Sequence, residues 1–157
     1  MENNSKNLIK NILLSFGLVI VVAGLGTLFT QLGMDWFDTL IKPSEWIPNY
    51  VIPIVWTVIY LTAGIVLFMW LQHDTMDKSL ATLFIINGVL NILWCLVFFT
   101  FNSLLLGLVV ILINLVFAIY LVIQIDKYRP IYARALLIYP VWLLIATGLN
   151  LAVWILN

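Results

Sequence analysis

Long apolar stretches alternate with short polar ones along the whole chain. Five of these stretches come close to the roughly 20 residues that a helix needs to cross the hydrocarbon core of a bilayer. They cover about residues 8–32, 50–71, 80–101, 104–125 and 133–156. Nearly all charged residues lie in the breaks between them. The pattern predicts an all-α integral membrane protein, a bundle of five transmembrane helices that forms a single domain over residues 1–157.

The composition leads to the same fold class. Of the 157 residues, 64% are hydrophobic and 9% are charged, and the mean hydropathy is +1.15. A water-soluble domain of this size could not cover so much apolar surface. The formal net charge is zero, which removes the electrostatic basis for binding nucleic acid. With one cysteine, Cys95, and one histidine, His73, we expect no disulfide within the chain and no metal site.

The basic residues divide unevenly between the two sides of the predicted bundle. Those on the side of the N-terminus are Lys6, Lys10, Lys78, Lys127, Arg129 and Arg134. On the opposite side only Lys42 is basic. Since the cytoplasmic loops of membrane proteins carry an excess of Lys and Arg, we expect the N-terminus in the cytoplasm and the first loop and the C-terminus outside.

A loop rich in proline and tryptophan, residues 33–49, separates the first two spans. Its prolines, together with the one that follows it, are Pro43, Pro48 and Pro53. Because proline fixes φ and lacks a backbone donor, the segment before Pro53 is predicted to be a compact, stiffened loop without a regular helix. Trp36 and Trp46 each offer a flat apolar face with one polar group. Such a loop either closes over a flat ligand or rests at the membrane surface, and the pattern leaves both possibilities open.

Polar and aromatic residues recur at helical spacing inside three of the spans. The sets that share a face are Trp56 and Tyr60; Asn87, Asn91 and Trp94; and Trp142, Ala146 and Asn150. Asparagines can bond across helices as packing contacts, and tryptophans can lie in the membrane interface. However, Trp94 and Trp142 lie well inside their spans, and the small Ala146 leaves room for a flat molecule. The pattern is therefore equally compatible with a ligand pocket among these helices.

Every Asp, Glu, Lys and Arg lies in or next to a predicted loop, and only Lys10 and Arg134 fall within the ends of predicted spans. The middle of each span therefore lacks the carboxylates and cations that proton relays and ion pathways use. The two halves of the chain also show no similarity, which disfavours an inverted-repeat transporter. A pocket of indoles and amides offers no group that titrates near neutral pH, which disfavours acid–base catalysis.

Several motifs follow one another along nearly the whole chain. In order, they are Gly24-Leu25-Gly26, the run from Trp36 to Ser44, the run from Pro53 to Tyr60, Leu90-Asn91 with Trp94, Phe98-Phe99, Trp142 with Ala146 and Leu149-Asn150, and the closing Trp154. In order and spacing they resemble the TspO/MBR family, which comprises the tryptophan-rich sensory proteins of bacteria and the translocator protein of mitochondria. No single motif is specific, but the complete series is.

The resemblance implies a five-helix protein of the bacterial plasma membrane, commonly a homodimer among membrane lipid. It implies binding of porphyrins such as protoporphyrin IX, or of haem, in a pocket under the first loop, with no cofactor required. Animal relatives also bind cholesterol and benzodiazepine-site drugs. Here Leu151 and Ile155 stand in the places of the tyrosine and arginine of the sterol-binding pattern, so sterol transport is not implied.

The resemblance also points to individual residues. Trp56, Asn91, Trp142 and Ala146 match positions that line or bond ligand in relatives, and Trp36 and Phe37 match the loop pair above it. With the periodic sets, the candidate ligand-binding residues are Trp36, Phe37, Pro43, Trp56, Tyr60, Asn87, Asn91, Trp94, Trp142, Ala146 and Asn150.

Three functions stay open at this point. The first is a sensor or scavenger that binds tetrapyrroles. The second is a light-dependent degrader of protoporphyrin IX, a reaction that the resemblance assigns to Trp56 and Trp142. The third is a transporter of porphyrins or other apolar ligands. His73 lies in a loop on the predicted inner side, so bound haem would lack a histidine ligand from this chain, and free porphyrin is the expected ligand.

Two departures from the family pattern affect the site. Tyr139-Pro140 stands in reversed order and closer to Trp142 than in relatives, which predicts a displaced kink in the last helix. Trp46 lies one residue later than the family's loop tryptophan, since Glu45 intervenes after Pro43-Ser44. Trp46 therefore either contacts ligand or rests in the membrane interface.

Overall fold

The computed structural model describes residues 2–44, 46–48, 50–73 and 78–157. Its elements are α1 (Glu2–Leu32), α2 (Met34–Thr39), α3 (Val51–His73), α4 (Lys78–Cys95), the π-helix η1 (Leu96–Thr100), α5 (Leu104–Asp126), α6 (Pro130–Leu136) and α7 (Ile138–Leu156). The described residues form helices and turns without any strand, which confirms the all-α fold class.

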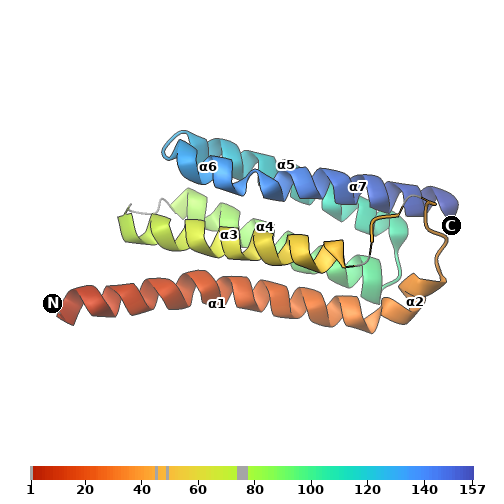
Figure 1. The fold of residues 1–157 in the computed structure, drawn as a ribbon, viewed down its shortest axis with the longest axis horizontal. Helices are drawn as coiled ribbons and strands as arrows, with labels where there is room; N and C mark the ends of the chain where they lie inside the picture. Colours follow the sequence, from red (N-terminus) through yellow and green to blue (C-terminus); the bar gives the residue numbers. More distant parts are fainter. Residues whose placement is uncertain (1, 45, 49, 74–77) are drawn as a thin grey trace.

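The long helices lie side by side in an antiparallel bundle (Figure 1). α1 packs on α3 and α4, α4 packs on α5, and α5 packs on α7. The N-terminus and the end of α3 lie at one end of the bundle, and α2 and the C-terminus lie at the other. We call these the N-terminal end and the α2 end.

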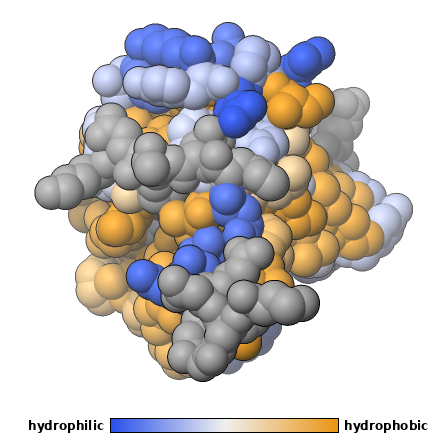
Figure 2. Space-filling model, turned by 90° about the vertical axis from the view of Figure 1, so that its left-hand side faces the viewer, coloured by the Kyte–Doolittle hydropathy of each residue, from blue (hydrophilic) through white to orange (hydrophobic). Residues whose placement is uncertain are grey.

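Five helical stretches of the described chain are long and apolar enough to cross a membrane. They are Asn7–Leu32, Val51–Gln72, Ser79–Thr100, Leu104–Asp126 and Pro130–Leu156. Many leucine, isoleucine and valine side chains along them are exposed, as lipid-facing side chains are. Figure 2, which views the N-terminal end, shows hydrophilic residues on this end and hydrophobic residues along the flanks. The predicted five spans and the integral membrane class are confirmed.

The prediction of a loop without a regular helix before Pro53 is wrong at two places. A short helix, α2, follows Gly33 directly, and it ends where Leu40 adopts an extended conformation with φ −72° and ψ 146°. α3 begins at Val51, two residues before Pro53. Proline is tolerated there because the N–H groups of the first helical turn have no acceptor within the helix.

Two irregularities in the helices were not predicted from hydropathy. The third span ends in the π-helix η1, where the Phe101 N–H donates to the Leu96 carbonyl over 2.9 Å. The fifth span is broken at Leu137, between α6 and α7, where the Leu137 N–H bonds to the Arg134 carbonyl over 3.3 Å. Pro140 follows this break and has no N–H for the carbonyl one helical turn earlier. The break thus lies just before Tyr139-Pro140, and its displacement relative to the helix of relatives stays a prediction.

Close backbone packing fixes the start of α2 against η1. A Cβ added to Gly33 would overlap the backbone carbonyl of Phe99, so only glycine fits between α1 and α2 at this approach. Next to it, the Thr100 hydroxyl donates to the Phe29 carbonyl over 3.0 Å. This junction holds Phe37 of α2 against Phe98 and Phe99 of η1.

Candidate ligand-binding cavity

A cavity of about 470 Å³ lies at the α2 end of the bundle. Residues of α1, α3, α4, η1 and α7 form its walls, and in the described part of the chain neither α5 nor α6 contributes to them. Phe37 of α2 and Trp46 of the segment that follows also line it. We call residues 34–44 and 46–48, which lie between α1 and α3, the covering segment; through Phe37 and Trp46 it is part of the cavity boundary. The volume falls within the range of about 300–1,000 Å³ that small-molecule sites usually have.

The walls on α3 and α7 are aromatic. On α3, Trp56 stacks on Tyr60, four residues later, with ring centroids 5.4 Å apart and an interplanar angle of 26°. On α7, Trp142 is 6% exposed and belongs to a buried cluster with Ile59 and Tyr139. Trp56 also approaches the Tyr139 ring, at 6.5 Å between centroids. α3 and α7 thus bring two indoles to one cavity.

The opposite wall, on α4 and η1, carries a second aromatic group. Trp94 stacks on Phe98 at a centroid distance of 5.5 Å and 28°, and it meets Phe99 edge-on at 5.8 Å. Phe37 reaches the same group from α2, 6.0 Å from Phe98 and 5.4 Å from Phe99. Aromatic surface therefore borders the cavity from α3, α4, η1, α7 and the covering segment.

Asn150 holds this arrangement together. The Trp94 Nε1–H donates to its Oδ1 over 3.2 Å, and its Nδ2 donates to the Leu104 carbonyl over 3.1 Å. One amide thus links α4, α5 and α7 behind the aromatic surface. Since both ends of the amide are bonded within the bundle, Asn150 is better suited to positioning Trp94 than to bonding a ligand.

Asn91 is the second amide at the cavity. It is 4% exposed and lies near Tyr139 of α7. The Tyr139 hydroxyl donates to the Oδ1 of Asn114 on α5 over 3.0 Å. Asn91 is therefore buried at the cavity wall, where an amide can donate to or accept from a ligand.

No charged residue lines the cavity within the described chain. One basic group lies beside a lining residue: the Nζ of Lys42, on the covering segment, is 4.4 Å from the centroid of the Phe37 ring. Its ion pair with Asp38, at 3.8 Å, involves a carboxylate that is 67% exposed. The interior therefore suits a flat, uncharged surface, and any charged substituent of a ligand would be favoured only near the covering segment.

Comparison with known proteins agrees with the motif series. The TspO/MBR family matches residues 15–155. The chain belongs to the TspO/MBR family. It is 33% identical to "Tryptophan-rich protein TspO" of Archaeoglobus fulgidus, an alignment that covers 88% of this chain and 92% of the relative. It is 30% identical to the protein of the same name in Chlorobaculum tepidum, over 92% and 94% of the two chains. It is 27% identical to "Tryptophan-rich sensory protein" of Cereibacter sphaeroides, over 78% and 77%.

Most of the candidate residues of this TspO/MBR chain meet at the one cavity. Those that line it are Phe37, Trp56, Tyr60, Asn91, Trp94, Trp142, Ala146 and Asn150. They come from four separate elements, α2, α3, α4 and α7, and helical periodicity alone had placed most of them on single faces of three helices. The arrangement in space is thus the one that a shared pocket requires.

Three candidate residues do not line the cavity. Trp36 packs edge-on against Phe98 at 5.9 Å and supports the cover from behind. Pro43 lies outside the lining as well. Asn87 lies one helical turn before Asn91 in α4 and outside the cavity lining. Its Nδ2 donates to the Leu83 carbonyl over 2.8 Å and to the Phe117 carbonyl over 3.4 Å. Its predicted place in the pocket is corrected to a packing contact between α4 and α5.

The cavity also contains residues that the candidate set missed. α1 contributes Ala23, Thr27 and Thr30, whose spacing of four and three residues places them on one helical face. In the sequence, that spacing already indicates a shared face of small and polar residues on this helix. Trp46 lines the cavity as well, with its ring 6.1 Å from that of Phe37, which places it within reach of a ligand.

Proposed function

We propose that this TspO/MBR protein is a membrane sensor or scavenger that binds a flat, mostly apolar tetrapyrrole in the cavity at the α2 end. The observation that carries the proposal is a cavity of about 470 Å³ that is bordered by Trp46, Trp56, Trp94 and Trp142 and has no charged residue in its described lining. Aromatic faces of this kind favour stacking on a large planar π-system. The name "Tryptophan-rich sensory protein" of the Cereibacter sphaeroides relative supports a sensory role.

Unmetallated porphyrin suits the cavity better than haem. The lining contains no histidine among the described residues, and His73 ends α3, whereas the cavity is lined by the first turns of that helix, Ile52 to Tyr60. At about 1.5 Å per residue, the backbone of His73 is roughly 20 Å further along α3 than Tyr60. Protoporphyrin IX, whose acidic substituents could lie near Lys42, is the ligand that we propose.

In this proposal the ring plane lies between α3 and α7, in contact with Trp56 and Trp142. Asn91 forms a hydrogen bond to the ligand from α4, and Phe37 and Trp46 cover it. Asn150 acts indirectly, by holding Trp94. Ala146 contributes by its small size, because a larger side chain at this lining position would occupy the space beside Trp142.

The test is a titration of protoporphyrin IX into the detergent-solubilised protein, followed by the Soret band. We expect saturable binding, and an affinity about 2- to 10-fold lower in Trp142→Phe because a smaller aromatic face is offered to the ring. Trp70→Phe is the matched control, since Trp70 is equally buried in the cluster at the N-terminal end and does not line the cavity. Saturable binding that both substitutions weaken equally, or that neither changes, would exclude this cavity as the site.

A further inference from the structure

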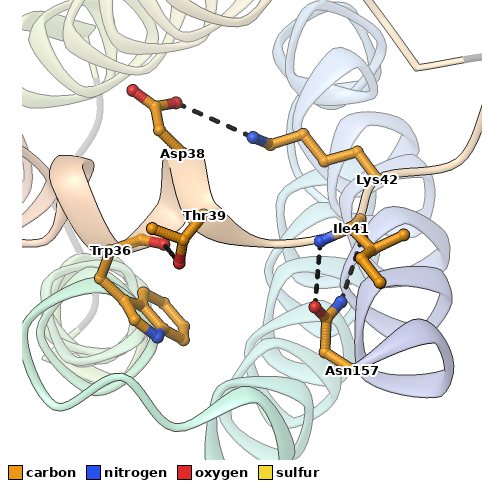
Figure 3. Close-up of polar contacts among 6 residues, drawn as sticks. All are labelled: Trp36, Asp38, Thr39, Ile41, Lys42 and Asn157. Atoms are coloured by element: carbon orange, nitrogen blue, oxygen red, sulfur yellow. Dashed lines mark hydrogen bonds and ion pairs between the residues drawn. The ribbon is translucent and has the colours of Figure 1, made fainter.

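The side chain of Asn157 connects the covering segment to the end of α7. Its Nδ2 donates to the Ile41 carbonyl, and the Ile41 N–H donates to its Oδ1, both over 3.0 Å (Figure 3). The same Nδ2 also donates to the Val153 carbonyl over 2.8 Å. One side chain therefore satisfies both backbone groups of a residue that is 116 positions away in the sequence.

The local backbone explains why Ile41 needs such a partner. α2 ends at Thr39, and Leu40 is extended, so the N–H and carbonyl of Ile41 lie beyond the hydrogen bonds of that helix. A carboxamide offers a donor and an acceptor side by side and can pair with both groups at once. The bond to Val153, one turn earlier in α7, fixes the orientation of the amide.

This paired contact lies between residues that border the cavity. On the covering segment, Ile41 comes between Phe37 and Trp46, which both line the cavity. On α7, Asn150 and Val153 line it as well. Close to Ile41, Lys42 forms an ion pair with Asp38 of α2 (Figure 3). Both residues belong to the covering segment, so this ion pair does not attach the segment to the rest of the bundle. The contact of Asn157 with Ile41 therefore ties the cover directly to a wall.

We propose that Asn157 is a latch: its two hydrogen bonds with Ile41 hold the covering segment across the cavity, and their rupture is the step that lets a bound ligand leave. This inference rests on the proposed function for its effect on a ligand. The latch itself is a property of the protein alone. Asn157 is a positioning residue, since it does not line the cavity.

The latch is tested first without ligand, by hydrogen exchange of the Ile41 amide in the detergent-solubilised protein. Asn157→Ala removes both bonds, and Asn157→Leu removes them at nearly constant side-chain size. We expect exchange at Ile41 to become about 5-fold faster or more in both variants, with amides in the middle of α3 and α5 unchanged. Unchanged exchange at Ile41 would overturn the latch.

The matched control is Ile41→Ala. Asn157 bonds the backbone of Ile41, and the Ile41 side chain is 61% exposed, so this substitution should leave the exchange rate at position 41 close to that of the wild type. If Ile41→Ala speeds exchange as much as Asn157→Ala does, apolar anchoring holds the segment instead, and the latch is overturned.

The effect on a ligand is measured as the dissociation rate of protoporphyrin IX after dilution into an excess of apo-myoglobin as acceptor. We expect dissociation to be about 5-fold faster in Asn157→Ala and Asn157→Leu, and unchanged in Ile41→Ala. Equal dissociation rates in all variants, together with faster exchange at Ile41, would mean that the latch does not control release and would overturn the proposal. Absence of porphyrin binding by the wild type would contradict the proposed function, and the exchange experiment alone would then decide whether the latch exists.

Discussion

At the scale of single residues, two asparagines on one helical face have different surroundings. Asn91 lies at the cavity and near Tyr139, whereas Asn87 bonds carbonyls of α4 and α5. Spacing of four residues predicts a shared face but not a shared depth in the membrane. The sequence could therefore identify the polar stripe on α4 but could not tell which amide meets a ligand.

This difference predicts a contrast between Asn91→Ala and Asn87→Ala. Loss of the Asn91 amide removes one hydrogen bond to the ligand, so the affinity for protoporphyrin IX should fall by about 2- to 10-fold. Asn87→Ala should leave the affinity unchanged, because Asn87 does not line the main cavity. Soret titrations of the two variants measure both values. An effect of Asn87→Ala equal to that of Asn91→Ala would contradict the assignment.

At the scale of elements, the covering segment depends on how α1 meets η1. Hydropathy predicted the spans to within a few residues, since burial in lipid constrains length and polarity. It could not predict η1, because a single π-helical turn within an apolar span is as hydrophobic as the α-helix around it. It also missed α2, because the prolines of the segment lie after this helix and leave its six residues free to form it.

The close contact between Gly33 and η1 allows a prediction about the stability of the folded protein. Gly33→Ala places a Cβ against the Phe99 backbone, which cannot yield as a flexible side chain would. We expect a loss of about 1–3 kcal/mol in the free energy of unfolding, measured by thermal or denaturant unfolding in detergent. Gly24→Ala, also in the α1 region, is the control. No described atom would lie within 4 Å of its Cβ, so the substitution should be neutral or stabilising by up to about 1 kcal/mol. Equal effects of the two substitutions would contradict the close approach of Gly33 to η1.

At the scale of the whole molecule, the bundle places the cavity at one of its ends, the α2 end. The excess of Lys and Arg on the other side predicts that the N-terminus is cytoplasmic and that the α2 end faces outward. Ser44 and Lys127 are exposed and lie toward opposite ends of the bundle. In intact cells, a membrane-impermeant maleimide should label the Ser44→Cys variant. The Lys127→Cys variant should be labelled only after the cells are permeabilised. The reverse labelling pattern would contradict this orientation.

The arrangement of the whole site was predictable to the extent that it rests on helical faces. Trp56, Asn91 and Trp142 converge as their spacing and the family resemblance indicated. The wall from α1 was missed because Ala23, Thr27 and Thr30 look like ordinary packing residues in an apolar helix. The Asn157 side chain joins the end of α7 to backbone groups of Ile41, and a contact with backbone groups leaves no pattern in the sequence.

The most direct measurement of the central claim is an experimental structure of the protein with protoporphyrin IX bound. We expect one porphyrin at the α2 end, with its plane between Trp56 and Trp142, the Asn91 amide within hydrogen-bonding distance, and Phe37 and Trp46 covering it. A porphyrin seated on the lipid-facing surface or at the N-terminal end, with this cavity empty, would contradict the proposed site.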